Sequence, residues 1–364
     1  MSDREDVAQT TLERCRALGF ALTGICRASP TGYRDEVQAW IADGCHGTME
    51  WLERRLDERL DPAVYLPGAQ SIICVADRYH DGARDRVDPE DRFRGRIARY
   101  ARGRDYHKVL KRRLVTLAKT LGGEHPDHDF RPCVDTAPLL EREHAQRAGL
   151  GLVGKHTLLI QPGVGSWMLL GAIVTTLPLE PTPGFTGADP CGSCTRCIDA
   201  CPTDAISPFR VDATRCIAYT TIEHRGDVDA EVAAATGDWL FGCDICQEVC
   251  PHNQRSRRRP PPPVNEAYRS ERADLPLEEI LGWSPEDRDR VLRGSAARRA
   301  TLDMWRRNAL VCIANVWRDD PGSITSQLLE RVRRIAEDRA ETSIVSEAAG
   351  RALEVGARST PDSG

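Results

Sequence analysis

Several protein classes are excluded by what this sequence lacks. It has no run of about eighteen uninterrupted apolar residues, because the longest apolar segment, 167–179, contains Gly171 and Pro178. The opening residues, MSDREDVAQT, include acids and no apolar core, so we expect no signal peptide. No G-x-G-x-x-G run opens a βαβ unit, and no Walker loop or H-E-x-x-H motif occurs. We therefore expect neither membrane association nor the chemistry that these motifs carry.

Aromatic residues are also scarce, at 5% of the chain, although 40% of the residues are hydrophobic. With 364 residues the chain is long enough for two or three domains. Helical and strand patterns mix without a βαβ rhythm, which favours an α+β fold. Proline-rich and glycine-rich stretches at 178–189 and 255–264 mark the boundaries of three predicted domains, 1–180, 181–262 and 263–364.

Apolar spacing predicts the main elements. Helices are expected at 6–19, 33–43, 49–60, 105–121 and 136–151, and strands at 20–26, 71–77 and 130–135. The arginine-rich stretch up to residue 104 is interpreted as an exposed loop, and 157–177 as a hairpin turning at 162–165. Helices at 275–283, 300–317, 324–337 and 344–356 follow one another without strands, as in helical repeats.

Eight of the 14 cysteines follow the spacing of bacterial ferredoxins. Residues 191–202 read C-x-x-C-x-x-C-x-x-x-C-P, and residues 243–251 read C-x-x-C-x-x-x-C-P with Cys216 upstream. In two-cluster ferredoxins the fourth cysteine of such a run ligates the other 4Fe-4S cluster. The rule assigns one cluster to Cys191, Cys194, Cys197 and Cys250, and the other to Cys201, Cys216, Cys243 and Cys246.

Tetrahedral zinc is the alternative, because paired C-x-x-C motifs also suit that metal. Two complete C-x-x-C-x-x-x-C-P runs, the first with an extra leading C-x-x, favour clusters. Cluster thiolates must stay reduced, so we expect the cytoplasm. The cysteines in apolar or helical contexts are interpreted as small buried side chains: Cys15, Cys26, Cys45, Cys74 and Cys312.

A long insertion, residues 217–242, separates Cys216 from Cys243, where a ferredoxin has two residues. A simple electron carrier has no need of this segment. We interpret it as a sign that something else is bound beside the second cluster.

Basic residues are concentrated in three places although the net charge is −5. Ten Lys and Arg and one acid, Asp105, lie between Arg92 and Arg113. The other two groups are Arg255 with Arg257 to Arg259, and Arg298, Arg299, Arg306 and Arg307 on a predicted helix. They form either a polyanion-binding face or ordinary solvated surface, and the sequence leaves both open.

Asp135 is the candidate acid of the N-terminal half. Its neighbours are mostly apolar, so desolvation could raise its pKa above the ordinary value of about 3.9 and let it deliver a proton near neutral pH. Alternatively, Asp135 or Thr136 caps the helix that follows.

Asp105-Tyr106-His107 resembles the start of a D-x-H-x-x-G box, which supplies a histidine to cobalt in some cobalamin proteins. Leu110 replaces the glycine and the segment reads as a helix, so we assign no histidine ligand. Tyr106 and His107 either line a pocket or cover a helix face.

Six motifs in order give the chain a family resemblance: YARGRDYHKVL, CVDTAPLLERE, AGLGLVGKHTLLI, the first cysteine run, WLFGCDICQEVCP and RRNALVCIANV. Together they resemble epoxyqueuosine reductase through nearly the whole chain. That family is cytoplasmic, cobalamin-dependent and related to reductive dehalogenases. It reduces the epoxide of epoxyqueuosine, at the wobble position of tRNA, to queuosine.

The resemblance implies a nitroreductase-like cobalamin-binding domain, a two-cluster ferredoxin domain and a HEAT-like helical tail, in a chain expected to be monomeric. It places the proton donor on Asp135. The implied cobalamin contacts are Arg59, Asp135, Lys155, His156, Thr157, residues 166–169, Gly242, Cys243 and Asp244, with no protein histidine on cobalt. The implied tRNA contacts are Glu223, His224, Arg225, Arg298, Arg299 and Asn308.

The implied mechanism passes electrons from an external donor through the clusters to cobalt, while Asp135 protonates the departing oxygen. A reductive dehalogenase is one rival, but many of its members carry an export signal and lack a helical tail. A ferredoxin-like electron-transfer subunit is another. The long N-terminal domain and the insertion argue against it.

Overall fold

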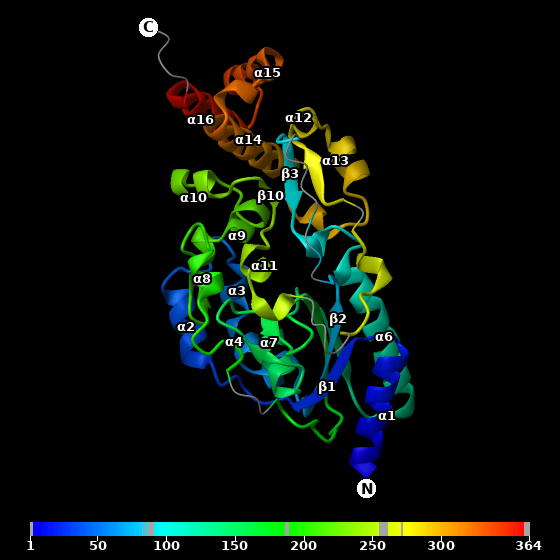
Figure 1. Cartoon of the computed structure of the whole chain (residues 1–364). Helices are drawn as coiled ribbons and strands as arrows, with labels where there is room; N and C mark the ends of the chain where they lie inside the picture. Colours follow the sequence, from blue (N-terminus) through cyan, green and yellow to red (C-terminus); the bar gives the residue numbers. More distant parts are fainter. Residues whose placement is uncertain are drawn as a thin grey trace.

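The computed structural model describes residues 3–81, 83, 85, 91–185, 189–254, 261–270 and 272–359. The N-terminal helix and the main sheet lie at one end of the molecule, and the last three helices lie at the other (Figure 1). The second basic group, Arg255 with Arg257 to Arg259, falls outside the described residues. Within the described ranges, no helix combines the length and apolar character needed to cross a bilayer.

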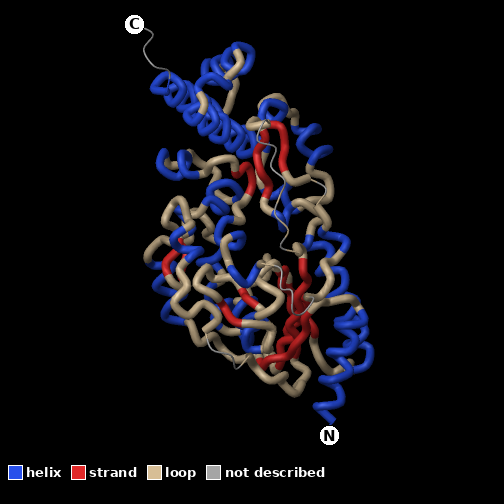
Figure 2. Tube along the Cα trace, in the orientation of Figure 1, coloured by secondary structure: helices blue, strands red, loops and turns tan. Residues whose placement is uncertain are grey.

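The main sheet is antiparallel throughout and has the order β1-β2-β7-β4 (Figure 2, strands in red). Its strands are β1 (Leu22–Arg27), β2 (Ser71–Arg78), β4 (Phe130–Cys133) and β7 (Met168–Thr175). β2 is buried along its full length because both faces of the sheet are covered. Ile73 and Val75 pack with α1 (Asp3–Ala17) and α6 (Tyr106–Glu124). Ile72 and Cys74 pack on the opposite face with α7 (Glu141–Arg147).

Four short helices lie between β1 and β2. They are α2 (Arg34–Ala42), α3 (Trp51–Arg54), α4 (Leu56–Leu60) and α5 (Pro62–Tyr65). The helix expected over 49–60 is therefore broken at Arg55, whose φ of −122° and ψ of 34° are not helical.

The hairpin expected over 157–177 is wrong. β7 pairs with β2 and β4, whereas β6 (Leu159–Ile160) pairs with β5 (Leu152–Val153). Across the expected turn there is one isolated bridge, between Gln161 and Gly165, in the part of the chain that is described. The sequence indicated two apolar strands and a turn, but strand partners depend on the tertiary fold. It could not show that β7 would pair with β2 and β4 in place of its neighbour β6.

A second sheet has the order β10-β3-β11 and joins segments far apart in the sequence. β10 (Trp239–Phe241) runs parallel to β3 (Arg94–Ile97), and β11 (Asp274–Pro276) runs antiparallel to it. The expected exposed loop up to residue 104 was thus wrong at β3, where Gly95 and Ile97 are buried. Each predicted domain contributes one strand to this sheet.

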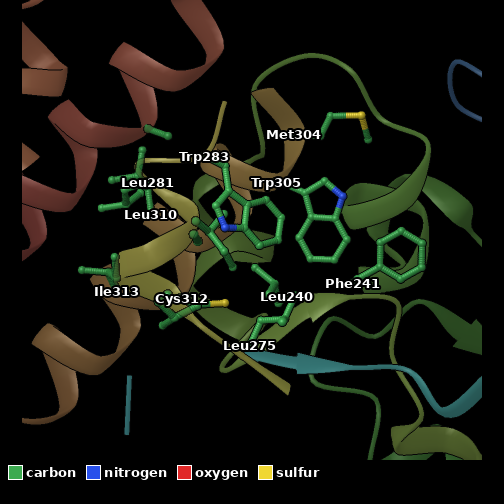
Figure 3. Packing of buried hydrophobic residues seen from close by; sticks show 14 of the residues in the cluster. Leu240, Phe241, Leu275, Leu281, Trp283, Met304, Trp305, Leu310, Cys312 and Ile313 are labelled. Carbon is green, nitrogen blue, oxygen red and sulfur yellow. The ribbon is translucent and has the colours of Figure 1, made fainter. Parts of the chain in front are cut away.

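The core beside this sheet is aromatic and aliphatic (Figure 3). Phe241 stacks on Trp305 with ring centroids 5.4 Å apart, and Leu240 and Leu275 lie in the same cluster. The helices around it are α12 (Leu277–Ile280), α13 (Pro285–Val291), α14 (Leu302–Asp319), α15 (Ser326–Glu337) and α16 (Ser343–Ser359). The three long C-terminal helices predicted from apolar spacing are confirmed, but 275–283 begins as strand β11.

The cysteine-bearing segment is built of short elements. They are α8 (Arg196–Asp199), β8 (Ile206–Ser207), β9 (Arg210–Val211), α9 (Ile217–Ile222), α10 (Ala230–Ala235) and α11 (Ile245–Glu248). α8 and α11, which follow equivalent positions of the two cysteine runs, pack against each other. This contact brings the two runs together.

Candidate active site

Four thiols line one cavity. Cys191, Cys194, Cys197 and Cys250 surround it together with His156, Pro190, Arg196, Pro251 and His252. Burial and then the nearby Cys191, Cys197 and Cys194 thiols raise the pKa of Cys250 to about 11. The cavity brings together the four thiols that the spacing rule assigns to one cluster, and their ligation of a cluster stays a prediction.

The other four thiols also lie near one another. Burial raises the pKa of Cys246, and the nearby Cys216 and Cys201 thiols add to this effect. Burial and then Cys246 and Cys216 raise the pKa of Cys243. Cys197 of the first group also contributes to the raised pKa of Cys246, so the two groups of thiols are neighbours.

Lys155 supports the first thiol group directly. Its backbone N–H donates to Cys191 Sγ at 3.3 Å. Its ammonium donates to the carbonyls of Gly192 and Cys194 at 2.7 and 3.1 Å. Lys155 therefore holds the loop that carries the first two cysteines.

Asp135 lies at one end of a hydrogen-bonded chain. Its Oδ2 is 2.9 Å from His107 Nε2, and His107 Nδ1 is 2.9 Å from Asp105 Oδ1. Asp105 is also the N-cap of α6, since its side chain accepts from the His107 N–H. This cap fixes the His107 ring between two carboxylates.

The interpretation of Asp135 as a helix cap is wrong. α7 begins only at Glu141, with Leu140 as its N-cap, and the Asp135 N–H donates to Glu141 Oε1 at 3.0 Å. The φ of Asp135 is +49°, a conformation that costs energy for residues other than glycine. Strain of this kind is concentrated at functional sites, where the surrounding structure maintains it.

The expectation of a raised pKa at Asp135 is also wrong in this structure. Burial raises its pKa, but the hydrogen bond and charge of His107 outweigh burial and leave the pKa below its ordinary value. Its side chain is 54% exposed. Burial lowers the pKa of His107, yet the bonds to Asp105 and Asp135 raise it to about 9. At neutral pH the proton of this chain therefore resides on His107.

Glu141 and Arg142 are site residues that the sequence analysis missed, although both stand in the quoted motif CVDTAPLLERE. Burial and then the Asp135 charge raise the pKa of Glu141 to about 8. Burial lowers the pKa of Arg142, against the opposing charges of Glu141, Asp135 and Cys246. Arg142 is thus close to both Asp135 and the second thiol group.

Three expected cofactor contacts surround this region. Arg59 Nε and His156 Nε2 are buried and have no hydrogen-bond partner among the described residues. Burial and then the Arg142 charge lower the pKa of His156 to about 4, so its imidazole is neutral. Thr157, with φ +66°, accepts from Arg142 Nη1 through its carbonyl and hydroxyl at 3.0 and 3.2 Å.

The segment 242–244 is tightly packed. A Cβ on Gly242, whose φ is +71°, would lie 2.6 Å from Ala98 Cβ, so packing requires a glycine. Asp244 is 1% exposed and accepts from the Arg99 N–H and Nη1 at 2.8 and 3.1 Å. Its carboxylate is held by Arg99, and the contact predicted with cobalamin remains a proposal.

The expected tRNA contacts fall into two sets. Glu223 and Arg299 form a bidentate pair, Arg225 is exposed, and Arg298 pairs with Asp289 at 3.2 Å. His224 is partly exposed, with Nε2 2.6 Å from the Asp227 carbonyl.

Asn308 makes up the second set and does not face outward, and neither does Arg307 of the third basic group. Asn308 is 3% exposed and donates to the carbonyls of Thr221 and Leu240, both at 3.0 Å. Arg307 is fully buried and donates to the carbonyls of Thr220, His224 and Gly226. The expectation of surface positions is wrong for both, because α14 uses them to hold the inserted segment.

Comparison with known proteins gives two family matches. The family model described as "Epoxyqueuosine reductase QueG, DUF1730" matches residues 59–136, and "4Fe-4S double cluster binding domain" matches residues 190–253. The second match agrees with clusters and not with the zinc alternative. Within the described ranges, no three His, Cys, Asp or Glu side chains form a group suited to a single metal ion.

Several curated relatives carry the name epoxyqueuosine reductase. The chain is 39% identical to the one from Xanthomonas campestris over 88% of this chain and 89% of the relative. It is 43% identical to the one from Synechococcus over 83% and 93%, and 37% identical to the one from Escherichia coli over 86% and 82%.

Solved structures agree with these names. An epoxyqueuosine reductase crystallised with an epoxyqueuosine-modified tRNA-Tyr stem loop superposes with a TM-score of 0.83 and 27% identity, covering 98% of this chain and 95% of that one. The Bacillus subtilis enzyme, with its catalytic aspartate loop swung out of the active site, superposes with a TM-score of 0.81 and 26% identity, covering 98% and 95%.

Proposed function

Because this chain belongs to the epoxyqueuosine reductase family, we propose that it reduces the epoxide of epoxyqueuosine in tRNA to the cyclopentenediol of queuosine. The observation that carries this proposal is the position of Arg142, which donates to the carbonyl and hydroxyl of Thr157 at 3.0 and 3.2 Å and lies near both Asp135 and Cys246. A candidate acid and a candidate electron entry thus lie beside one guanidinium. The reaction needs both, since two electrons and two protons enter and water leaves.

We propose that the cavity-lining cysteines hold one 4Fe-4S cluster and the second thiol group holds the other. Crossed ligation is supported by the shared cavity and by the mutual pKa effects. The expected three-part organisation is kept as a proposal: a nitroreductase-like domain around β1-β2-β7-β4, a ferredoxin-like domain and a HEAT-like tail of α14 to α16. We place the protein in the cytoplasm, because a reducing compartment keeps the cluster cysteines from forming disulfides.

Cobalamin fits the residues beside this region. Arg59 Nε and His156 Nε2 are buried polar atoms without partners among the described residues, and such atoms need a hydrogen-bonding group. We propose that Arg59, residues 155–157 and residues 242–244 hold the corrin and its amides. When bound and reduced, cobalamin supplies a strongly nucleophilic, reducing cobalt centre.

The proton chemistry is assigned to Asp135 and His107. Asp135 delivers a proton to the departing epoxide oxygen, because an alkoxide is a poor leaving group. Asp135 is ionised at neutral pH, so this proton comes from the His107 imidazolium, 2.9 Å away, and passes through Asp135 to the oxygen. A donor with a depressed pKa can act here because its partner stores the proton at neutral pH.

One assay tests the proposed function. The protein is purified anaerobically with iron, sulfide and cobalamin, given a chemical reductant, and incubated with epoxyqueuosine-containing tRNA. We expect nucleoside mass spectrometry to show conversion to queuosine. Persistence of the epoxide with fully loaded cofactors would contradict the proposal.

A pH profile tests the proton store. The pKa of His107 is raised to about 9, so the protonated form is present below that pH and is lost as the pH rises through it. We expect kcat to fall on the alkaline side near pH 9. In the Asp105→Asn variant the alkaline limb of the kcat profile should move down by about 1–3 pH units, because one of the two carboxylates that stabilise the His107 imidazolium is gone.

Asparagine is as good an N-cap as aspartate, so α6 should keep its start in this variant. Asp127→Asn, an exposed change, is the control and should leave the limb in place. An alkaline limb unmoved in Asp105→Asn would remove His107 from the proton path.

A further inference from the structure

Trp51 is a large apolar side chain that the structure leaves exposed, with 39% of its surface accessible. It opens α3, in the N-terminal half of the chain. The guanidinium carbon of Arg299 lies 5.1 Å from the centroid of its ring. The ring therefore marks a place where segments almost 250 residues apart meet at the surface.

Glu223 fixes the guanidinium in this position. Arg299 Nε donates to Glu223 Oε1 at 3.0 Å, and Nη2 donates to Oε2 at 2.8 Å. Arg299 nevertheless remains 47% exposed. The bidentate pair sets the orientation of the guanidinium plane, so Arg299 is held over one face of the Trp51 ring while both groups stay partly open to solvent.

Tyr100 connects this surface with the site of Asp135, because its ring packs edge-on against Tyr106 at 5.9 Å and Tyr106 stacks on His107, the partner of Asp135. The Glu223 bond raises the pKa of Arg299, and the Asp135 and Tyr100 charges contribute to the shift. Burial and then the Asp135 and Glu223 charges raise the pKa of Tyr100. Tyr100 is therefore near both the acid and the pair that holds Arg299.

We propose that the exposed part of the Trp51 ring is a stacking platform for one unpaired base of the tRNA anticodon loop, beside the nucleotide that reaches Asp135. The proposal rests on the proposed function. Proteins recognise single-stranded RNA loops by stacking splayed bases on aromatic rings and guanidinium planes. Arg299 supplies the charge for a neighbouring phosphate, and Glu223 holds Arg299 in place before RNA arrives.

Base stacking and phosphate contact differ in how strongly RNA binding depends on salt concentration. This difference separates the role of Trp51 from that of Arg299. Binding of an epoxyqueuosine-containing anticodon stem loop to the cofactor-loaded protein is measured by fluorescence anisotropy over a series of KCl concentrations. We expect Trp51→Leu to weaken binding about tenfold with an unchanged salt slope, and Trp51→Phe to bind close to wild type. Arg299→Gln should reduce the slope by about one.

Tyr33→Ala removes an aromatic of similar exposure, 45%, and should leave binding unchanged. Wild-type affinity in Trp51→Leu, or a loss that Trp51→Phe shares in full, would overturn the platform. A reduced salt slope in Trp51→Leu would overturn it too, since the ring would then act only through Arg299. Epoxide reduction by the wild type is scored separately, so failure of the proposed function and failure of the platform give different results.

Discussion

Replacing Asp135 with asparagine is expected to lower kcat by about 10²–10⁴-fold while both clusters and cobalamin stay bound. The amide cannot supply the proton that the departing epoxide oxygen needs. Asparagine has the same shape and tolerates a positive φ, so the +49° backbone at this position is kept. Single-turnover reduction of epoxyqueuosine tRNA, followed by mass spectrometry, measures the effect.

Iron, cobalt and visible absorbance are measured on the same Asp135→Asn sample, so that loss of cofactor is not mistaken for loss of the acid. Asp127→Asn, the same chemical change at an exposed site, should retain wild-type kcat. A kcat within about threefold of wild type in Asp135→Asn would remove this residue from the proton transfer.

Removal of single cluster ligands is expected to abolish turnover and to show which thiols share a cluster. The Cys250→Ser variant should lose the cluster held by Cys191, Cys194 and Cys197, and the Cys216→Ser variant should lose the other cluster. Each change should lower the iron content from about eight to about four atoms per chain. Reduction of epoxyqueuosine should fall below detection in both variants, because each cluster is needed to carry electrons. Iron analysis and electron paramagnetic resonance of the reduced samples check this.

Double variants make the test specific. Cys216→Ser combined with Cys243→Ser should lose no more iron than either change alone, whereas Cys216→Ser combined with Cys250→Ser should lose nearly all of it. Cys312→Ala, at a buried thiol in the core of α14, should keep both clusters. Equal iron in the two double variants would contradict crossed ligation.

The double-cluster segment could be predicted because the spacing of its cysteines is a local property of the chain. The electrostatics of Asp135 could not be predicted, because its partner, His107, is 28 residues away in the sequence. The apolar neighbours of Asp135 indicated desolvation, but a histidine held by Asp105 reverses the direction of the pKa shift. The sign of a pKa shift depends on which charge faces the group, and that is a tertiary property.

The prediction that Arg307 and Asn308 lie at the surface was wrong for a related reason. Polar residues in a basic cluster are normally exposed, and nothing in their spacing indicated that a segment 83 to 87 residues upstream would offer them carbonyls. Strand β3 was missed for the same reason. Arg94 and Arg96 were interpreted as solvated, but Arg94 pairs with Asp274 and Arg96 pairs with Asp238 beside the sheet.

The β10-β3-β11 sheet has a consequence for how this protein can be divided. Its middle strand comes from the first predicted domain and its two outer strands from the others, so cutting the chain at either proposed boundary strips β3 of a partner. A chimera that exchanged only the C-terminal helices between relatives would also have to carry a compatible β3 and β10. The cysteine-bearing segment and the C-terminal helices therefore depend on the same strand and cannot be exchanged independently of it.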